Sequence, residues 1–439
     1  MKKKYRIILY TSIFLLCVVA SIILVVKKSN SVYEEESKPK VVKHKSMLSM
    51  NLEQTAGAGD YKQVTQSSWP TEGYKFNAEL SKCENGSTLS WDDTKKAVIM
   101  QGNVSDKCYV YFDIWIPSIA DYCTSGTDLA TCVKNFGDQG PSVSNIYIHN
   151  SSLTNGAGDN SYRYAGANPN NFVCFGSDTS PCPTDNLYRI IGVFGENYHG
   201  VTGKQLVKLI KYDYMTTDEL GTDGDYSQTY KEWGMDSTYK GTYGDGERIG
   251  VYYWNYKATG SATNTWSTSL LNKTNLNTNF INNIGTTWAN KIATVTWKVG
   301  GNTYANISDV VPATTYQNEI VNPVTTNTTD NATTYSAKIG LMYVSDYGFA
   351  ASPDAWTLTM SSYNNTTATN NNWMYMGLYE WTISRNADNS NHALYVNYDG
   401  YVFSYIVNFS CGVRASFSLE SSVSYVSGSG SMSDPIVIN

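Results

Sequence analysis

The chain has 439 residues and a formal net charge of −6, and no basic run follows Lys45. This pattern argues against nucleic acid as a partner, because proteins that bind it present a concentrated basic surface. The 35 tyrosines and 11 tryptophans, together with many Ser, Thr, Asn and Gly residues, favour an α+β, β-rich and turn-rich fold over two or three domains.

An apolar segment near the N-terminus predicts a membrane anchor. Residues 7–26 carry no charge, and basic residues flank them up to Arg6 and from Lys27 onward. At about 1.5 Å per residue the span matches a bilayer core of about 30 Å. A cleavable signal has a shorter apolar region and a cleavage site of small residues, which is not found after this span. We therefore expect a transmembrane signal anchor over 1–28 and a flexible linker over 29–67.

Cysteine spacing predicts three local disulfides. Six of the eight cysteines fall into pairs that are close in sequence, which in a loop-rich chain is typical of an oxidising compartment. Basic residues on both sides of the anchor leave its orientation open, so the disulfides decide that the C-terminal bulk is expected outside the cell. Of the other two cysteines, Cys17 lies in the predicted anchor, and Cys411 is expected to be a buried or half-buried free thiol. The expected pairs are Cys83 with Cys108, Cys123 with Cys132, and Cys174 with Cys182.

Residues 68–116 are expected to form a small β module. Alternating apolar residues predict strands that begin near Tyr74, Leu89, Val98 and Cys108. A Cys83–Cys108 bridge would close a loop of about 25 residues and stabilise the module by roughly 3 kcal/mol. A metal site at the same two cysteines is the alternative, but no third ligand is near in sequence.

A connector over 117–140 is expected to lead into a large α+β domain over 141–439. Within this connector a short helix is expected from Asp128 to Phe136. The main helical region is expected over 266–292, because Leu276, Phe280, Ile284 and Trp288 recur on one helix face. The runs that favour strands are 172–175, 187–194, 205–214 and 339–344.

The C-terminal stretch 373–414 reads as a compact β unit. Strands are expected over 373–384, 393–398 and 401–407, with a closing strand at 412–414. Asp399-Gly400 is a strong hairpin signal between the second and third of these strands. Aromatic and β-branched residues build its framework, and polar residues and tyrosines occupy its turns.

The sequence gives no positive support for catalysis, and no cofactor or metal is expected. The four histidines are scattered, and a nucleophilic pair of Cys411 with His392 would lack an orienting acid and an oxyanion motif. The spacing of the acidic residues within 219–250 fits no EF-hand, so a solvated acidic loop is expected there rather than a Ca²⁺ site. These acidic residues are Asp223, Asp225, Asp245 and Glu247.

Several motifs carry a resemblance to a known group of proteins. In chain order they are Val173–Gly176, Leu187–Val193, Leu206–Ile210, Ile339–Ser345, Glu380–Ser384, Asp399-Gly400 and Gly412–Arg414. The chain resembles uncharacterised surface-protein domains of gut bacteria that close with a GVRP-type strand, with Ala415 in place of the proline. More distantly it resembles the C-type-lectin-like fold of formylglycine-generating enzymes and of diversity-generating retroelement variable proteins. The catalytic cysteine pair of those enzymes has no counterpart beside Cys411, so their activity is not implied.

The resemblance implies a ligand-binding surface near the C-terminus, where variable proteins diversify. The absence of Lys, Glu, Gln, Trp and Met from 384–419 does not support diversification, because 140–195 lacks the same residues. Hypervariability is thus a separate hypothesis, and solvated hairpin residues of a structural domain are the plain alternative. The candidate ligand-binding residues are Asn386, Asp388, Asn391, His392, Tyr395, Asn397, Tyr398, Tyr401, Tyr405 and Asn408.

Together these features predict a single-pass cell-membrane protein with an N-terminal transmembrane helix, a small disulfide-stapled β module and a large C-type-lectin-like domain. Its expected function is adhesin-like binding of an extracellular glycan or protein. A structural envelope protein without a specific ligand is the alternative, and an enzyme of unknown activity comes third.

Overall fold

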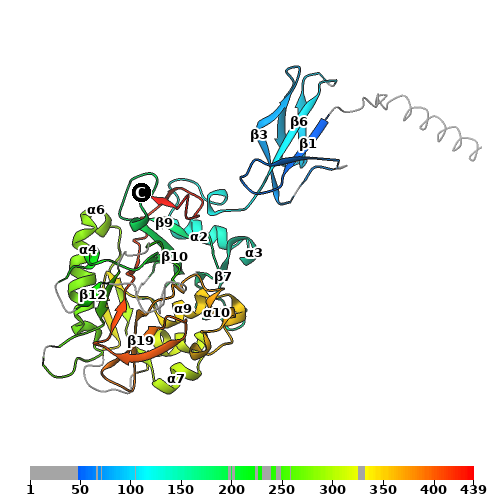
Figure 1. Ribbon diagram of the computed structural model, residues 1–439. Helices are drawn as coiled ribbons and strands as arrows, with labels where there is room; N and C mark the ends of the chain where they lie inside the picture. The colour runs from blue at the N-terminus through cyan, green and yellow to red at the C-terminus, as the bar shows by residue number, and fades with distance from the viewer. Residues whose placement is uncertain are drawn as a thin grey trace, which may run out of the picture. The chain divides into compact units, whose positions relative to one another are not determined.

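The computed structural model describes residues 48–439, except 66–67, 71, 104, 196–198, 200–202, 223–225, 230–238, 244–248, 258 and 325–331. The predicted membrane segment 7–26 and most of the predicted linker therefore lie outside the described residues. Among the helices that are described, none combines the length and the apolar character needed to span a bilayer. The chain forms two compact units, unit 1 up to Ile116 and unit 2 from Pro117 onward (Figure 1).

Unit 1 is a β module, as predicted. The described residues of unit 1 form a main four-stranded sheet in the order β2 (Tyr61–Val64), β1 (Leu48–Glu53), β6 (Cys108–Ile114) and β3 (Tyr74–Cys83). A separate hairpin consists of β4 (Thr88–Asp92) and β5 (Ala97–Gln101).

The linker predicted over 29–67 is wrong in its last part, because it contains β1 and β2. Strand β1 runs parallel to β6, and Met50 and Leu52 point into the core beside Val110 and Phe112. Alternate residues of a strand point to the same face, so two apolar side chains suffice to bury one side of this short segment. The surrounding charged and small residues concealed that alternation.

The three predicted disulfides are confirmed in the described part of the chain. Cys83–Cys108, Cys123–Cys132 and Cys174–Cys182 are each bonded. Cys411 is a fully buried free thiol, as expected.

Unit 2 begins earlier than predicted, since the expected connector is part of its core. Helix α2 (Leu129–Gly137) starts after Asp128, whose carboxylate accepts a hydrogen bond from the Thr131 amide at 2.8 Å. Such an N-cap satisfies an amide at the start of the helix. Cys132, Val133 and Phe136 of α2 join the main hydrophobic core, which explains why this segment is inseparable from the large domain.

The first sheet of unit 2 contains the most apolar strands. Strand β10 matches its predicted bounds, and all eight of its residues are buried. Its described strands run β17 (Ile339–Gly340), β22 (Ser416–Ser418), β11 (Leu206–Lys211), β10 (Leu187–Phe194), β8 (Tyr162–Tyr164) and β7 (Ile146–Ile148), with β9 (Phe172–Cys174) also paired to β10.

The second sheet contains the C-terminal hairpin. Its described strands run β12 (Tyr226–Thr229), β13 (Gly250–Tyr253), β21 (Ser410–Gly412), β18 (Glu380–Asn386), β19 (His392–Val396) and β20 (Val402–Ile406), with β15 (Gly301–Asn302) also paired to β18. Two smaller pairs are β14 (Val295–Lys298) with β16 (Thr334–Ala337), and β23 (Tyr425–Ser427) with β24 (Val437–Ile438).

Short helices cover and connect these sheets. The helical region predicted over 266–292 is confirmed, and its longest part is the π-helix η5. The other described helices are η1 (Ile119–Asp121), α3 (Pro141–Ser144), η2 (Thr184–Asn186), α4 (Thr217–Leu220), η4 (Trp266–Thr268), η5 (Leu271–Phe280), α5 (Ile281–Asn283), α6 (Gly285–Ala289), α7 (Tyr304–Asp309), α8 (Pro312–Tyr316), η6 (Gln317–Val321), α9 (Val344–Ala350), η7 (Pro353–Ala355), η8 (Met360–Ser362) and α10 (Thr366–Thr369).

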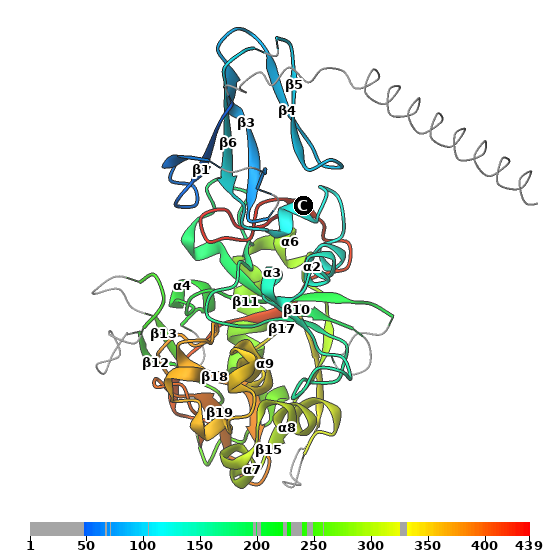
Figure 2. The same cartoon turned by 90° about the vertical axis from the view of Figure 1, so that its right-hand side faces the viewer.

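The two sheets are joined by one continuous segment and one buried helix. Strand β21 of the second sheet is followed after three residues by β22 of the first. Helix α9 is buried along its whole length and contacts β8 in the first sheet. It also contacts β18 and β19 in the second sheet, and Figure 2 shows it beside these two strands. The hairpin of β19 and β20 is therefore fixed to a core that extends through both sheets.

Three predicted strands differ from the structure. The closing strand expected over 412–414 is β21, which ends at Gly412, and residues 413–415 link it to β22. Residues 373–378 are buried but irregular, and β18 begins only at Glu380. The strand expected over 339–344 is limited to β17, because Val344 already starts α9. These last two stretches are continuous apolar runs, and such runs do not distinguish strands from other buried segments.

Candidate functional site

The β19–β20 hairpin separates its two faces by strict alternation. Tyr395 pairs with Phe403, and Ala393 pairs with Tyr405, on one face of the sheet. Leu394 and Val402 alternate with them and are fully buried in the core. The hairpin thus has one core face and one aromatic face, and both come from residues two apart in sequence.

A network of rings covers the aromatic face, and we call it the tyrosine face. The Tyr405 and Phe409 ring centroids are 4.7 Å apart, and Tyr395 contacts Tyr379 at 5.8 Å. These separations are typical of favourable edge-to-face aromatic pairs. The tyrosine face consists of Tyr379, Tyr395, Tyr398, Tyr401, Phe403, Tyr405 and Phe409.

The tyrosine face has a buried base and an exposed rim. Tyr395 is 6% exposed, whereas Tyr398 and Tyr405 are 39% and 41% exposed. The backbone carbonyl of Tyr398 accepts a hydrogen bond from the Tyr375 hydroxyl at 2.5 Å, which ties the hairpin turn to the domain. Exposed aromatic side chains are thus held on a rigid support.

Burial favours the neutral form of three tyrosine hydroxyls on this face, those of Tyr379, Tyr395 and Tyr401. Burial raises the pKa of Tyr379 to about 12, with smaller contributions from Tyr398 and Tyr401. Burial also raises the pKa of Tyr395 and of Tyr401 above the ordinary value of 10.0. Neutral phenols both donate and accept hydrogen bonds, which suits recognition of polar groups.

Two of the predicted site residues shape the turns of the hairpin. Asn386 is buried, and its side-chain oxygen accepts hydrogen bonds from the amides of Asp388 and Asn389 at 3.0 and 3.2 Å. Asn397 is buried as well, and its side-chain amide donates to Asp399 Oδ1 at 2.7 Å. These two asparagines hold loop conformations, as Asn side chains commonly do.

Three further predicted residues lie away from the tyrosine face. Asp388 and Asn391 belong to the turn between β18 and β19, His392 begins β19, and His392 Nδ1 lies 2.8 Å from Asn391 Oδ1. His392 is three positions from Tyr395 on the same strand, so its side chain points to the opposite face. Asn408 is exposed in the connection from β20 to β21. The structure therefore brings together Tyr395, Tyr398, Tyr401 and Tyr405, but not the turn residues with them.

Sequence reasoning missed three members of the tyrosine face as site residues. Phe403 is directly paired with Tyr395, while Tyr379 and Phe409 precede β18 and β21. One signal could have placed Tyr379 on this face. Tyr379 is two positions from Trp381, so the two side chains point to the same side, and Trp381 pairs with Tyr395.

A buried ionic cluster was also not predicted, and it contains groups of the kind that enzymes use. Arg163 donates to Asp159 at 2.9 Å and lies 3.5 Å from Asp346, which in turn binds Lys208 at 2.5 Å. His199 Nε2 lies 3.0 Å from Asp159. Burial alone would raise the pKa of Asp346, but the charges of Lys208 and Arg163 outweigh burial and lower it.

Glu319 completes this cluster on the side of α9. Its carboxylate accepts hydrogen bonds from Ser384 and from the amides of Val344 and Ser345. Burial raises its pKa to about 7, although these hydrogen bonds oppose the shift.

The cluster leaves little room for a substrate. The cavity beside Lys208 and His199 measures about 10 Å³ among the described residues, which is close to the space of a single water molecule. Its charges are instead paired with one another inside the core. Cys411 is likewise fully buried, and burial raises the pKa of its thiol well above 9.0, so it lacks the thiolate character of a nucleophile.

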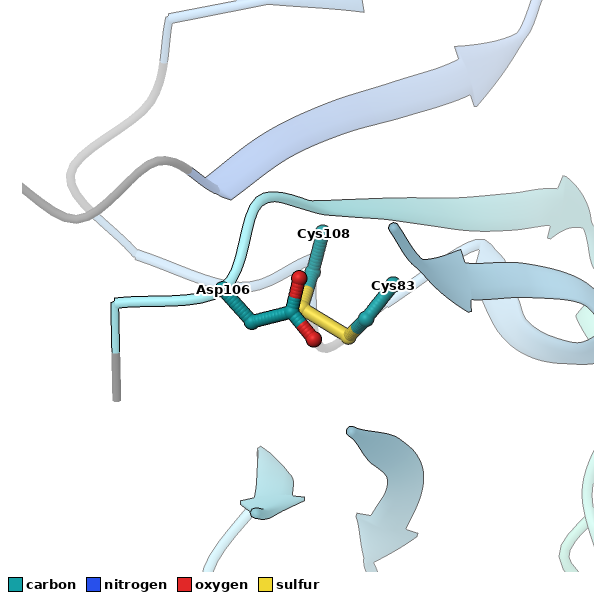
Figure 3. A group of neighbouring side chains, drawn as sticks. All are labelled: Cys83, Asp106 and Cys108. Atoms are coloured by element: carbon teal, nitrogen blue, oxygen red, sulfur yellow. A yellow bond between two sulfur atoms is a disulfide. The ribbon is translucent and has the colours of Figure 1, made fainter. Parts of the chain in front are cut away.

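The expectation that no third potential metal ligand lies near Cys83 and Cys108 is wrong, because Asp106 lies beside them in the described residues (Figure 3). The two sulfur atoms are bonded to each other, so neither is a free thiolate. The Asp106 carboxylate accepts hydrogen bonds from the amides of Asn85 and Ser87 at 2.8 and 3.1 Å. This group is therefore a disulfide beside a carboxylate that braces a turn. Asp223, Asp225, Asp245 and Glu247 lie outside the described residues.

Comparison with known proteins found no matching family model, no matching curated protein and no matching solved structure. The resemblance to gut-bacterial surface domains and to the C-type-lectin-like fold therefore stays a prediction.

Proposed function

We propose that this protein binds an extracellular ligand through the tyrosine face of its C-terminal hairpin. The observation that carries the proposal is the exposed rim of Tyr398 and Tyr405 above a packed base of aromatic rings. Exposed apolar side chains that are scattered singly need no explanation, whereas a contiguous group on a rigid hairpin favours recognition.

The residue types of this surface suit binding more than chemistry. Tyrosine offers a large contact area with few rotatable bonds, so it loses little entropy when a ligand covers it. The exposed residue Asn408, in the connection that follows β20, supplies a hydrogen-bonding amide at the edge of the hairpin. An extracellular glycan or protein is the class of ligand that such a mixed surface accommodates.

The proposal includes a position at the cell surface. The three disulfides support an oxidising environment for the C-terminal bulk, and the apolar span over 7–26 supports a single-pass anchor. In this arrangement a C-type-lectin-like domain presents the hairpin to the outside.

The test compares full-length protein in detergent with a Tyr398→Ser/Tyr405→Ser double variant. Both are applied to arrays of glycans and of extracellular proteins, and Tyr109→Ser, a half-exposed tyrosine of unit 1, is the matched control. We expect the double variant to lose at least tenfold in affinity for the captured ligand, about 1.4 kcal/mol, while its unfolding temperature is unchanged. Unchanged binding by the double variant would show that the ligand uses another surface.

A further inference from the structure

A cleft of about 310 Å³ opens in unit 2 next to the tyrosine face. It lies between residues 167–172 and 372–376, and Tyr212, Lys240 and Met432 complete its walls. The Tyr375 hydroxyl reaches from the cleft wall to the carbonyl of Tyr398. Its volume is at the lower end of ligand pockets, which span about 300–1,000 Å³.

Arg189 is a buried cation in the wall of this cleft. Its guanidinium carbon lies 4.4 Å from the ring centroid of Phe172 and 4.6 Å from that of Trp373. It donates to Asn171 Oδ1 at 2.7 Å and to the carbonyls of Pro169 and Trp373 at 2.9 and 3.4 Å. These contacts use three of the five N–H groups of an arginine, and all three acceptors are neutral.

The charge of Arg189 is thus not compensated by any carboxylate that the structure describes. Arg163 and Arg414, by contrast, are equally buried and each forms an ion pair with a carboxylate. A buried charge without a counter-ion is costly. Burial lowers the pKa of Arg189 to about 9, opposed by Tyr212 and reinforced by the charge of Arg414.

A second cation, Lys240, faces the same cleft independently. Its ammonium lies 4.6 Å from the Tyr375 ring centroid and donates to the carbonyl of Thr369 at 2.7 Å. This contact leaves two of the three ammonium donors available. Lys240 is exposed, so its charge is presented to a molecule that enters from solvent.

We propose that this cleft binds the carboxylate of an acidic sugar, such as a uronic or sialic acid residue of a glycan. The carboxylate would sit between Arg189 and Lys240, because charge-assisted hydrogen bonds to carboxylates are the strongest that these groups make. The buried rings of Trp373 and Tyr375 hold the two cations in place, and the 40% exposed side chain of Met432 gives the cleft an apolar wall for a sugar ring. The amides of Asn168 and Asn170 at the cleft mouth match its hydroxyls.

The two sites rest on different residues and can fail separately. The proposed function depends on Tyr398 and Tyr405, whereas the acidic-sugar site depends on Arg189 and Lys240. Their proximity through Tyr375 would let a long glycan occupy both.

The test is calorimetric titration of the full-length protein in detergent with defined probes. These are trigalacturonic acid, its methyl ester, 3′-sialyllactose, lactose, sodium sulfate and the peptide Gly-Gly-Tyr with a free C-terminus. We expect at least one of the two acidic sugars to bind, and its neutral counterpart, the methyl ester or lactose, to bind at least about tenfold more weakly, equivalent to one charge-assisted contact of about 1.4 kcal/mol. Raising the salt concentration should weaken the binding of the acidic probe, because salt screens the charge of the exposed Lys240.

Four variants, two of them in the cleft and two outside it, assign that binding to the cleft. Lys240→Gln should weaken the acidic sugar about fivefold or more, as expected for loss of about 1 kcal/mol. Lys273→Gln, an equally exposed lysine on η5, is the matched control and should have no effect. Arg189→Gln should abolish binding, and it is interpreted only if its near-ultraviolet circular dichroism matches that of the parent protein. Tyr405→Ser should leave binding of the acidic sugar intact.

Several outcomes would overturn the proposal. Equal binding of the acid and its methyl ester would show that the carboxylate is not recognised. Equal binding of the acidic sugar by Lys240→Gln and by the parent protein would show that the sugar does not bind in this cleft. Binding of Gly-Gly-Tyr or of sulfate with neither acidic sugar bound would assign the cations to another class of anion.

Discussion

Arg414 and Glu380 form a bidentate ion pair in the core of unit 2. Arg414 Nε lies 2.8 Å from one carboxylate oxygen of Glu380, and Nη2 lies 2.9 Å from the other. Nη2 also donates to the carbonyl of Met374 at 2.7 Å. Because Arg414 lies in the segment that links β21 to β22, the pair fastens the connection between the two sheets to β18.

Replacing Arg414 with lysine should destabilise unit 2 strongly. Lysine keeps the charge but not the planar fork, so it cannot contact both oxygens and Met374 together. Disrupting a buried pair of this kind costs about 3–5 kcal/mol, and we expect the free energy of unfolding in guanidinium to fall by that amount. The matched control is Lys204→Gln, which removes an exposed pair with Glu420 at 3.8 Å and should cost less than about 1 kcal/mol. Similar losses of unfolding free energy in Arg414→Lys and Lys204→Gln would mean that the buried ion pair contributes no more stability than the exposed one.

Glu319 should make the protein less stable as the pH rises. Its pKa is about 7 in the folded state against an ordinary value of 4.5, so the folded state binds this proton more tightly. The stability that it contributes is complete below about pH 4.5 and is lost as the pH rises through 7, a total of roughly 3 kcal/mol. We expect Glu319→Gln to remove this decline, measured as the difference in unfolding free energy between parent and variant at pH 5 and pH 8.

The paired comparison isolates Glu319 from the histidines that titrate in the same range. His149 and His199 have lowered pKa values, chiefly because of burial, and are common to parent and variant. An exposed-site control, Glu84→Gln in unit 1, should leave the pH dependence unchanged. A constant difference between parent and Glu319→Gln across this range would mean that Glu319 ionises at its ordinary pKa in the folded protein.

Gly400 should be irreplaceable at the tip of the hairpin that supports the tyrosine face. Its φ is +103°, and an added Cβ would lie 2.6 Å from Thr369 Cγ2 and 2.9 Å from the Tyr363 carbonyl oxygen. Gly400→Ala therefore combines backbone strain with a steric clash and should cost more than about 2 kcal/mol. Gly260→Ala separates the two effects, because Gly260 has a φ of +80° with open space around it. Equal losses of stability in Gly400→Ala and Gly260→Ala, measured by thermal unfolding, would mean that backbone strain alone accounts for the effect at Gly400.

Local patterns predicted the framework of this fold well. The apolar run Leu187–Phe194 is a strand with the predicted bounds, because it is buried on both faces. The Asp-Gly dipeptide predicted the β19–β20 hairpin because Gly400 adopts the positive φ that such turns require. The run 373–378 was expected to be a strand, but backbone carbonyls within it bind side chains and not a neighbouring strand. The carbonyls of Trp373 and Met374 accept hydrogen bonds from the side chains of Arg189 and Arg414.

The candidate sites were predictable only in part. Four tyrosines of the tyrosine face were predicted from their position near the hairpin, yet Tyr379 and Phe409 join it through pairings between β18, β19 and β21. The cleft was not predicted, because Arg189 lies within an otherwise apolar strand and its partners are distant in sequence. Such sites arise from the juxtaposition of segments, which no local pattern encodes.

If this hairpin is diversified in nature, variation should follow exposure rather than sequence position. Asp388, Tyr398, Tyr405 and Asn408 are exposed and can change without loss of folding. Asn386, Tyr395 and Asn397 are buried and hold the turns or the ring network, so substitution there would destabilise the hairpin by about 1–3 kcal/mol. Sequencing the codons for 384–419 in many cells of one natural population measures this directly. Clustered changes at the exposed group above a constant buried group would establish a diversified surface. Changes that ignore burial would contradict the structural constraint, and an invariant stretch would leave a binding surface of fixed specificity or a structural domain.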